Sequence, residues 1–271
     1  MTLQIPGFSY RRAKVGGGVE LNVAVGGSGR AVVLLHGFPQ THLMWRHVAA
    51  DLVDSYTVIC PDLRGYGDSD KPAATGPETY SKRTMAADAL SLARELGHER
   101  FAVIGHDRGA LVAIRAGLDH PDVISHVACL DVLPTLDMWD VLHGATAAVA
   151  FHLYLMAQPP GLPEAMIAAS AFRDAYLTAS ANAVPSIVAD YRASAGIDME
   201  HDQADRAAGR RLTMPVTVIQ QDWGTALGFD AAGIWRSWAL DLRHLTTRAG
   251  HFMAEEAPDE VTSAVRALLE R

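Results

Sequence analysis

The sequence predicts an α/β fold in which a mostly parallel sheet is covered by helices on both faces. Apolar runs of strand length alternate with longer amphipathic stretches, which is the pattern of successive βαβ units. The runs at 31–37 and 100–105 are apolar throughout, as expected of strands buried on both faces. A chain of 271 residues can fill such a core without disulfides or metals.

The expected elements follow one another in a regular order. Residues 18–27 alternate polar and apolar and end in glycines, which indicates an antiparallel strand near the N-terminus. The helix expected at 82–97 should end at Gly97, because glycine favours the left-handed conformation of a helix C-cap. Further strands are expected at 31–37, from 57, and at 100–105, 123–134, 214–222 and 243–250, and further helices at 108–120 and after His251.

The pattern changes between Pro134 and Met214, where Ala- and Leu-rich helical pieces replace the strands. Such an insertion between two core strands is typical of a helical cap over the carboxyl edge of the sheet, where open α/β sheets bind ligands. We therefore predict a core formed by residues 1–134 and 214–271, with a short helical cap at 135–213.

The composition is that of an ordinary soluble globular protein with a net charge of −8. It offers neither a basic face for nucleic acid nor a polybasic membrane anchor. Without an apolar signal segment, we expect a cytoplasmic protein with a small-molecule substrate. Cys60 and Cys129 lie in apolar runs and are expected to be reduced core thiols. No cofactor or metal is expected, because no ligand spacing or nucleotide fingerprint is present. The oligomeric state is left open, a homodimer included.

The run GHDRGA at 105–110 lies between an expected strand and an expected helix. This is the arrangement of a nucleophile elbow, in which flanking glycines allow a sharp turn and leave the central side chain exposed above the sheet. We predict Asp107 as the nucleophile, with a simple helix N-cap as the alternative. A carboxylate that attacks a saturated carbon gives a stable alkyl ester, whereas attack on an acyl group gives a reactive anhydride. The residue type therefore favours halide displacement or epoxide opening.

The sequence also contains the other parts of a catalytic set. His251 lies between the last expected strand and the final helix, where it could deprotonate the water that cleaves the ester. Its orienting acid could be Asp131 or Asp222, since both end expected strands. The backbone N–H groups of Phe38 and Arg108 are expected to form an oxyanion hole.

Similar runs are spread over nearly the whole chain: HGFPQTHLMW, PDLRGYGDSDKP, YSKRTMAADAL, GHDRGA, LDVLPT, MAQPPGLPE, DYRASAGIDMEHD and GHFMAEEAPDE. Together they resemble the fluoroacetate and haloacetate dehalogenases of the α/β-hydrolase superfamily. The resemblance implies an α/β-hydrolase fold with a helical cap, and hydrolysis of small 2-haloacids. It implies that Asp107 displaces the halide and that Asp131 is the acid.

Under the same resemblance, Arg108 would grip the substrate carboxylate. A cation in the first turn of a helix opposes the helix dipole, so Arg108 calls for an anionic partner. A structural salt bridge to a neighbouring carboxylate is the alternative. His152 and Tyr191 match cap positions that hydrogen-bond the departing halide; a polar core histidine and a packed tyrosine are the alternatives.

Three features depart from the family pattern. Leu111 stands where the family usually has a second arginine, and Leu153 stands where it has a tryptophan beside the halide histidine. The cap is also shorter between Glu164 and Tyr191. Fluoride is the poorest leaving group among the halides and depends most on such donors. We therefore expect weak or absent fluoroacetate activity and better use of chloro- or bromo-acids or of a larger electrophile.

Two other functions fit the same residues. An epoxide hydrolase shares the nucleophile and base and uses cap acids, for which Tyr154 and Tyr191 are candidates. The apolar residues Leu111 and Leu153 favour this reading. A non-catalytic ligand receptor on a hydrolase scaffold is the third, although a receptor has no need of a complete Asp–Asp–His set.

Overall fold

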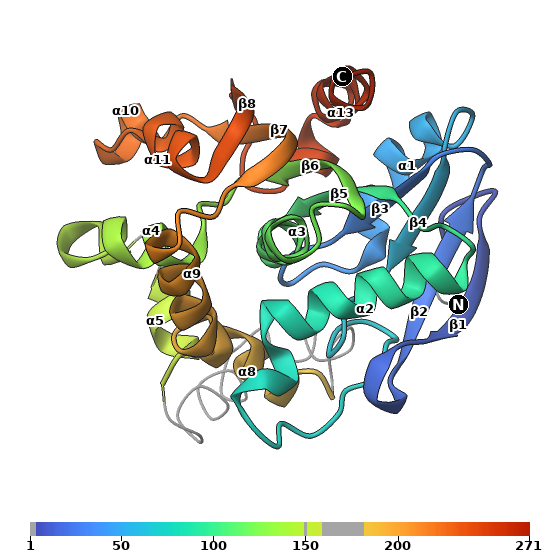
Figure 1. Ribbon diagram of the computed structural model, residues 1–271, viewed down its shortest axis with the longest axis horizontal. Helices are drawn as coiled ribbons and strands as arrows, with labels where there is room; N and C mark the ends of the chain where they lie inside the picture. The colour runs from blue at the N-terminus through green and yellow to red at the C-terminus, as the bar shows by residue number, and fades with distance from the viewer. Residues whose placement is uncertain (1–3, 149–150, 159–181) are drawn as a thin grey trace.

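The computed structural model describes residues 4–148, 151–158 and 182–271. Its eight-stranded sheet has the order β1-β2-β4-β3-β5-β6-β7-β8 (Figure 1). β2 runs antiparallel to both of its neighbours, and the other strand pairs are parallel, so the predicted fold class is confirmed. The strands are β1 (Ser9–Lys14), β2 (Glu20–Gly26), β3 (Ala31–Leu35), β4 (Thr57–Pro61), β5 (Phe101–His106), β6 (Ile124–Leu130), β7 (Leu212–Gln221) and β8 (Ala239–Thr247).

Alternate residues of the central strands divide the core into two apolar layers. Val33 and Leu35 of β3 belong to the layer under α2 (Lys82–Glu95) and α3 (Arg108–Asp119). Val32 and Leu34 belong to the layer under α1 (Arg46–Leu52) and α13 (Pro258–Leu269). Figure 1 shows these two helix pairs on opposite sides of the sheet. The helices are α1 (Arg46–Leu52), α2 (Lys82–Glu95), α3 (Arg108–Asp119), α4 (Thr135–Val141), α5 (Phe151–Met156), α8 (Val184–Ser194), α9 (Ile197–Ala207), α10 (Trp223–Leu227), α11 (Ala231–Trp238), α12 (Met253–Glu256) and α13 (Pro258–Leu269), with 3₁₀ turns η1 (Gly16–Gly18), η2 (His42–Trp45), η3 (Pro77–Tyr80) and η4 (Gly144–Ala148).

The expected core elements are present, with shifted bounds in places. α2 ends as predicted, since Gly97 has a φ of 87° just beyond it. β7 begins at Leu212 rather than at Met214, and β8 begins at Ala239 rather than at Arg243. β1 was not expected, because its polar sequence SYRRAK reflects an exposed edge strand rather than a buried one.

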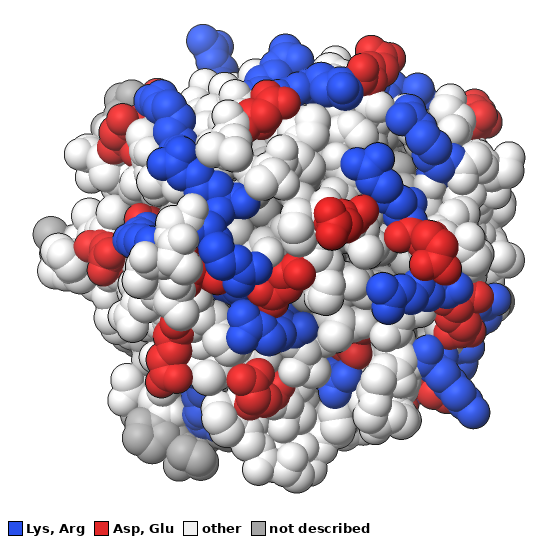
Figure 2. Space-filling model, in the orientation of Figure 1, with Lys and Arg blue, Asp and Glu red and all other residues white. Residues whose placement is uncertain are grey.

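Between β6 and β7 the described residues form α4, η4, α5, α8 and α9. Part of the Ala- and Leu-rich stretch, and most of the shortening expected between Glu164 and Tyr191, fall on residues 159–181, outside the described residues. None of the described helices is long and apolar enough to cross a membrane. Figure 2 shows both basic and acidic side chains spread over the face seen in Figure 1. Cys60 and Cys129 are buried free thiols, as predicted, and burial raises the pKa of both.

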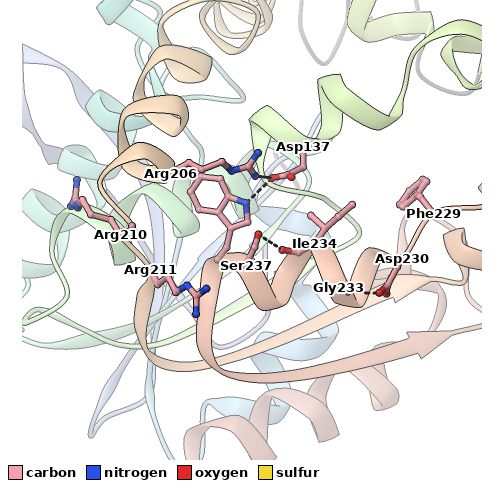
Figure 3. Close-up of a pocket in the computed structure, with 11 residues that line it drawn as sticks. Asp137, Arg206, Arg210, Arg211, Phe229, Asp230, Gly233, Ile234 and Ser237 are labelled. Atoms are coloured by element: carbon pink, nitrogen blue, oxygen red, sulfur yellow. Dashed lines mark hydrogen bonds and ion pairs between the residues drawn. The ribbon is translucent and has the colours of Figure 1, made fainter.

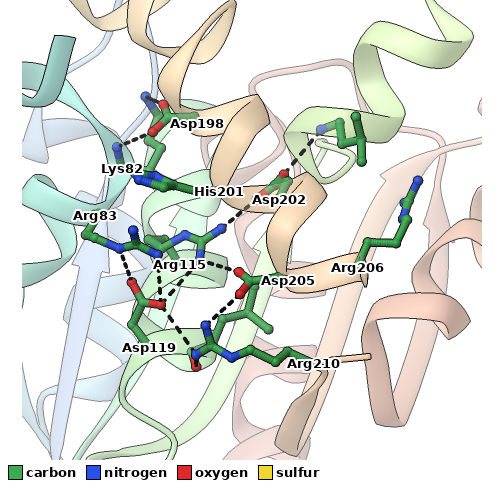
Figure 4. Close-up of polar contacts among 12 residues, drawn as sticks. Lys82, Arg83, Arg115, Asp119, Asp198, His201, Asp202, Asp205, Arg206 and Arg210 are labelled. Carbon is green, nitrogen blue, oxygen red and sulfur yellow. Dashed lines mark hydrogen bonds and ion pairs between the residues drawn. The ribbon is translucent and has the colours of Figure 1, made fainter. Parts of the chain in front are cut away.

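A buried ion-pair network joins α9 to α3, the helix that follows the elbow (Figure 4). Arg115 of α3 contacts Asp202 with its Nη2 at 2.6 Å and Asp205 with its Nη1. Arg210 also binds Asp205, at 2.6 Å. The second oxygen of Asp202 accepts the backbone N–H of Leu136 at 3.2 Å. These contacts fix α9 against α3 and the start of α4.

The Asp202→Asn variant should show how much ionisation of this buried carboxyl lowers the free energy of unfolding. Burial raises the pKa of Asp202 to about 6, although Arg115 opposes the shift. Because the pKa of Asp202 is higher in the folded state than in the unfolded chain, the protonated carboxyl favours folding. This contribution to the free energy of unfolding is complete below the unfolded pKa of about 4 and is lost as the pH rises through 6. We expect thermal unfolding scans to show the variant gaining on the wild type by about 1–2 kcal/mol between pH 4.5 and pH 7.5. Parallel pH profiles would contradict this, and Asp241→Asn, on the surface, is the control.

Candidate active site

The elbow turns between β5 and α3 with a strained backbone at its centre. Asp107 has φ 47° and ψ −114°, a conformation that costs a non-glycine residue energy and is typical of functional positions. A Cβ on Gly105 would collide with the backbone of Gly109, and a Cβ on Gly109 would collide with the backbone of Leu35. The two flanking glycines are therefore required for the close crossing of strand and helix.

The carboxylate of Asp107 faces the loop that follows β3. The backbone N–H of Phe38 donates to its Oδ1 at 2.9 Å, as an oxyanion-hole donor at that position would. Burial alone would raise the pKa of Asp107. His251, His106, Arg108 and the Phe38 N–H together outweigh burial and hold the pKa below its ordinary value. The group is therefore an anion at neutral pH, as a nucleophile must be.

His251 is held by Asp131, the acid at the end of β6. Its Nδ1 lies 2.7 Å from Asp131 Oδ2. Asp131 is fully buried on its side-chain atoms and accepts two further bonds from Gln221, at 3.0 Å from the backbone N–H and 2.8 Å from Nε2. Desolvation lowers the pKa of His251, but the bond to Asp131 and the charge of Asp107 raise it by more. Of the two acids left open by the sequence, Asp131 is the one bonded to the imidazole.

This contact predicts a large difference between two matched variants. Asp131→Asn should lower steady-state turnover by about 10³- to 10⁴-fold, because the amide favours the wrong tautomer of His251. Asp222→Asn, at the end of the next strand, should change turnover far less. Initial rates with the best substrate of the wild type compare the two, and the reverse order would show that Asp222 is the acid.

The three residues open onto one cavity of about 220 Å³. Its walls are mostly apolar. Besides Asp107, Asp131 and His251, the lining residues are Val132, Met138, Leu142, His152, Leu153, Gln221, Trp223 and Leu227. Leu153 is thus in the wall, where its side chain provides no hydrogen-bond donor. The sequence predicted the polar floor of the cavity but not its wall from α4 and α10.

Arg108 does not line this cavity. It is 1% exposed and bound to Asp190, with Nε 3.0 Å from Oδ2 and Nη2 2.8 Å from Oδ1. Nη2 also donates to Ser194 Oγ at 2.6 Å. The expected grip on a substrate carboxylate is therefore replaced by the alternative, a structural ion pair, because a buried guanidinium needs a permanent anionic partner.

Asp190 connects Arg108 to a larger buried cluster, which consists of Lys82, Arg108, Asp190 and Asp198. Lys82 contacts Asp190 and lies 3.4 Å from Asp198. The two cations and two carboxylates cancel, and Tyr66 donates its hydroxyl to Asp190 at 2.6 Å. Beside the nucleophile the protein therefore holds a neutral charge cluster rather than a surplus of positive charge.

Leu111 also lies away from the cavity, contrary to the expectation that it makes the pocket apolar. It lines a small internal void of about 10 Å³ with Lys82, Arg115 and Asp198. Its place on α3 turns it toward the contact between α2 and α9, not toward Asp107.

His152 lines the cavity, whereas Tyr191 is not among its lining residues. Their rings are 5.9 Å apart, and the Tyr191 ring is 5.7 Å from that of Phe38. The hydroxyl of Tyr191 is buried, and no group of the described residues bonds to it. Burial and the charge of Asp107 keep the pKa of Tyr191 well above 10, so the hydroxyl stays protonated and can donate. Arg108 packs on the ring from 4.2 Å.

Tyr154 is the one member of the expected tyrosine pair that does not fit. Its hydroxyl donates to the carbonyl of Leu142, and its ring packs against Trp139 at 5.1 Å. Like Tyr191, Tyr154 is not among the residues that line the cavity, so the difference between them lies in the hydroxyl. A hydroxyl already bound to a backbone carbonyl is a poor proton donor to substrate.

A larger groove of about 730 Å³ lies elsewhere, between α9 and α11 (Figure 3). Arg206 pairs with Asp137 there at 2.5 Å and packs on Trp238, whose Nε1 donates to Asp137 at 2.6 Å. None of the predicted site residues lines this groove. Arg206 and Arg210, two of the three arginines between residues 206 and 211, are thus held in ion pairs.

The elbow, the histidine on its loop and the acid at the end of β6 define a hydrolase of the α/β type. The family model of the alpha/beta hydrolase fold matches residues 30–159, and the chain belongs to this family. It is 36% identical to a fluoroacetate dehalogenase from Burkholderia sp over 289 aligned residues, which cover 97% of this chain and 94% of that protein.

Epoxide hydrolases are also among the relatives. A soluble epoxide hydrolase from Corynebacterium sp. (strain C12) is 31% identical, covering 89% of this chain and 81% of that protein. The solved structure of a putative epoxide hydrolase from Pseudomonas aeruginosa superposes with a TM-score of 0.90 at 39% identity, covering 100% and 98% of the two chains. The relatives thus establish a hydrolase and include both enzyme types.

Proposed function

We propose that this protein is a hydrolytic dehalogenase that acts on small 2-haloacids through an ester on Asp107. The observation that carries the proposal is the anionic carboxylate of Asp107 at the floor of the cavity, with the His251–Asp131 pair lining the same space. An aspartate at this position suits displacement at a saturated carbon. The likeness to the Burkholderia dehalogenase over almost the whole chain also supports it.

The reaction would proceed in two balanced steps. A carboxylate oxygen of Asp107 forms a bond to the halogen-bearing carbon, and the carbon–halogen bond breaks with its electron pair leaving as halide. His251, oriented through Nδ1 by Asp131, then takes a proton from water with Nε2. The resulting hydroxide attacks the ester carbonyl, and the Phe38 N–H stabilises the developing oxyanion. The bond between the carbonyl carbon and the alkoxide oxygen then breaks, the imidazolium of His251 returns its proton to the alkoxide, and the hydroxy acid leaves. Asp107 loses the proton of the added hydroxide to solvent and is again a carboxylate.

His152 and the hydroxyl of Tyr191 are proposed to stabilise the departing halide. Their proximity to Asp107 and the protonated state of Tyr191 support this role. Leu153, where the family has tryptophan, supplies no N–H. Losing one such donor costs about 1.5–3 kcal/mol, on the order of tenfold or more in rate. We therefore propose chloro- and bromo-acids as better substrates than fluoroacetate.

Epoxide hydrolysis is the second candidate, and the Arg108–Asp190 pair favours it. The neutral cluster around Asp190 offers no surplus positive charge to a substrate carboxylate. Tyr191 and His152 could protonate the epoxide oxygen in place of a tyrosine pair. A ligand receptor is the third reading, which the bonded His251–Asp131 pair disfavours.

A substrate panel would distinguish these functions. Purified protein is offered chloroacetate, fluoroacetate, 2-chloropropionate and styrene oxide, with halide release and diol formation measured. Halide from chloroacetate supports the proposal, while diol without halide would make the protein an epoxide hydrolase. Turnover of none of these, with tight binding of a metabolite, would support the receptor.

A further inference from the structure

His106 joins the nucleophile's strand to the loop of the general base. It is the last residue of β5 and is fully buried. Its Nε2 lies 2.8 Å from the backbone carbonyl oxygen of His251. The two imidazole rings also pack together, with centroids 4.6 Å apart and planes at 51°. One side chain thus contacts both the main chain and the ring of the base.

The contact determines the tautomer of His106. A carbonyl oxygen only accepts, so Nε2 must carry the hydrogen. Nδ1 is buried, and within the described residues no group bonds to it. Desolvation and the nearby His251 lower the pKa of His106 to about 4, so the ring is neutral with a bare Nδ1 at neutral pH. The donor to the His251 carbonyl is therefore permanent over the working pH range.

The opposite side of the ring faces the loop that carries the Phe38 N–H. A Cβ on Gly37 would lie 2.7 Å from His106 Nδ1 and 2.6 Å from Asp107 Cβ. The imidazole therefore fills the space between the oxyanion loop and the base loop. Removing it leaves a gap between the two loops, next to the nucleophile.

We propose that His106 is a positioning residue for ester hydrolysis, which holds the base loop so that His251 meets the ester. The proposal rests on the proposed function, because it needs the Asp107 ester. Since His251 acts only after the ester has formed, His106 should matter for the second step and not for halide displacement. If His106 only stabilised the fold, its replacement would reduce the amount of folded protein, and halide displacement and ester hydrolysis would fall together.

Two variants distinguish the effect of the His106 hydrogen bond from the effect of the side-chain volume. In His106→Gln the side-chain amide can place an N–H near the position of Nε2, whereas His106→Leu keeps the volume without a donor. With chloroacetate, His106→Leu should lower steady-state turnover by about 10- to 100-fold. It should release the first equivalent of halide at nearly the wild-type rate, and intact mass should show the ester. His106→Gln should restore most of the turnover.

The control is His126→Gln, near the start of β6 and away from the site. Circular dichroism and the melting temperature show whether each variant folds. If His106→Leu does not fold, His106→Asn replaces it, because the shorter asparagine amide cannot reach the Nε2 position. Slowed first-equivalent halide release without ester accumulation would overturn the proposal. Equal defects in the glutamine and leucine variants would also overturn it. If wild-type Asp107 is never alkylated, the proposed function itself fails, which intact mass shows separately.

Discussion

Asp107→Asn is expected to abolish turnover while the protein stays folded. The amide cannot form the ester, and loss of a nucleophile costs roughly 10⁴-fold or more in rate. The surroundings hold the pKa of Asp107 below its ordinary value, so its charge stabilises the folded state, and the melting temperature should fall slightly without loss of the fold. Halide release and thermal unfolding, measured on the same preparation, test both parts.

Asp107→Ala is the matched variant, because an asparagine at a nucleophile position can hydrolyse back to aspartate. Both variants should still bind substrate in the cavity. Retention of more than about one-tenth of the activity in the alanine variant would mean that another group attacks the substrate and that the mechanism is wrong.

His251→Asn is expected to stop the reaction after its first half. Asp107 remains able to displace the halide, but no base activates water, so the ester accumulates. One equivalent of halide per protein should appear, followed by steady-state turnover reduced by roughly 10³-fold or more. Intact mass should show the added alkyl group, and its loss when Asp107 is also replaced identifies the site. A variant that releases no halide at all would place His251 in the first step.

The pH dependence follows from the same imidazole. Asp131 and Asp107 raise the pKa of His251 against desolvation, and only the neutral ring accepts a proton. Ester hydrolysis should therefore be slow in acid and should increase as the pH rises through a pKa above 6.5. Release of the first equivalent of halide should persist to lower pH, because the pKa of Asp107 is held below its ordinary value.

The residues that the sequence predicted well are those fixed by local chain geometry. The elbow needs only a strand, two glycines and a helix in succession, and all of these are visible around Asp107. Asp131 and His251 end or follow parallel strands, so they gather at one edge of the sheet. Choosing between Asp131 and Asp222 needed the resemblance, because position along the strands does not distinguish them.

The errors came from contacts made by the helices between β6 and β7. The partner of Arg108 is Asp190, which lies 82 positions away and reaches the core only when α8 is packed against it. Tyr154 was predicted from residue type, but its hydroxyl had a nearby backbone carbonyl to satisfy. His106 gave one signal, a polar side chain ending an apolar strand, which sequence reasoning passed over.

The buried cluster of Lys82, Arg108, Asp190 and Asp198 links two parts of the molecule, the core and the helices between β6 and β7. Each half carries charge that only the other half neutralises: the cations come from α2 and α3, and the carboxylates come from α8 and α9. A cap transplanted from a relative would leave unpaired buried charges unless positions 190 and 198 came with it. Recombination within the family is therefore restricted to partners that share all four charges, which ties changes in the cap to the helix beside the nucleophile.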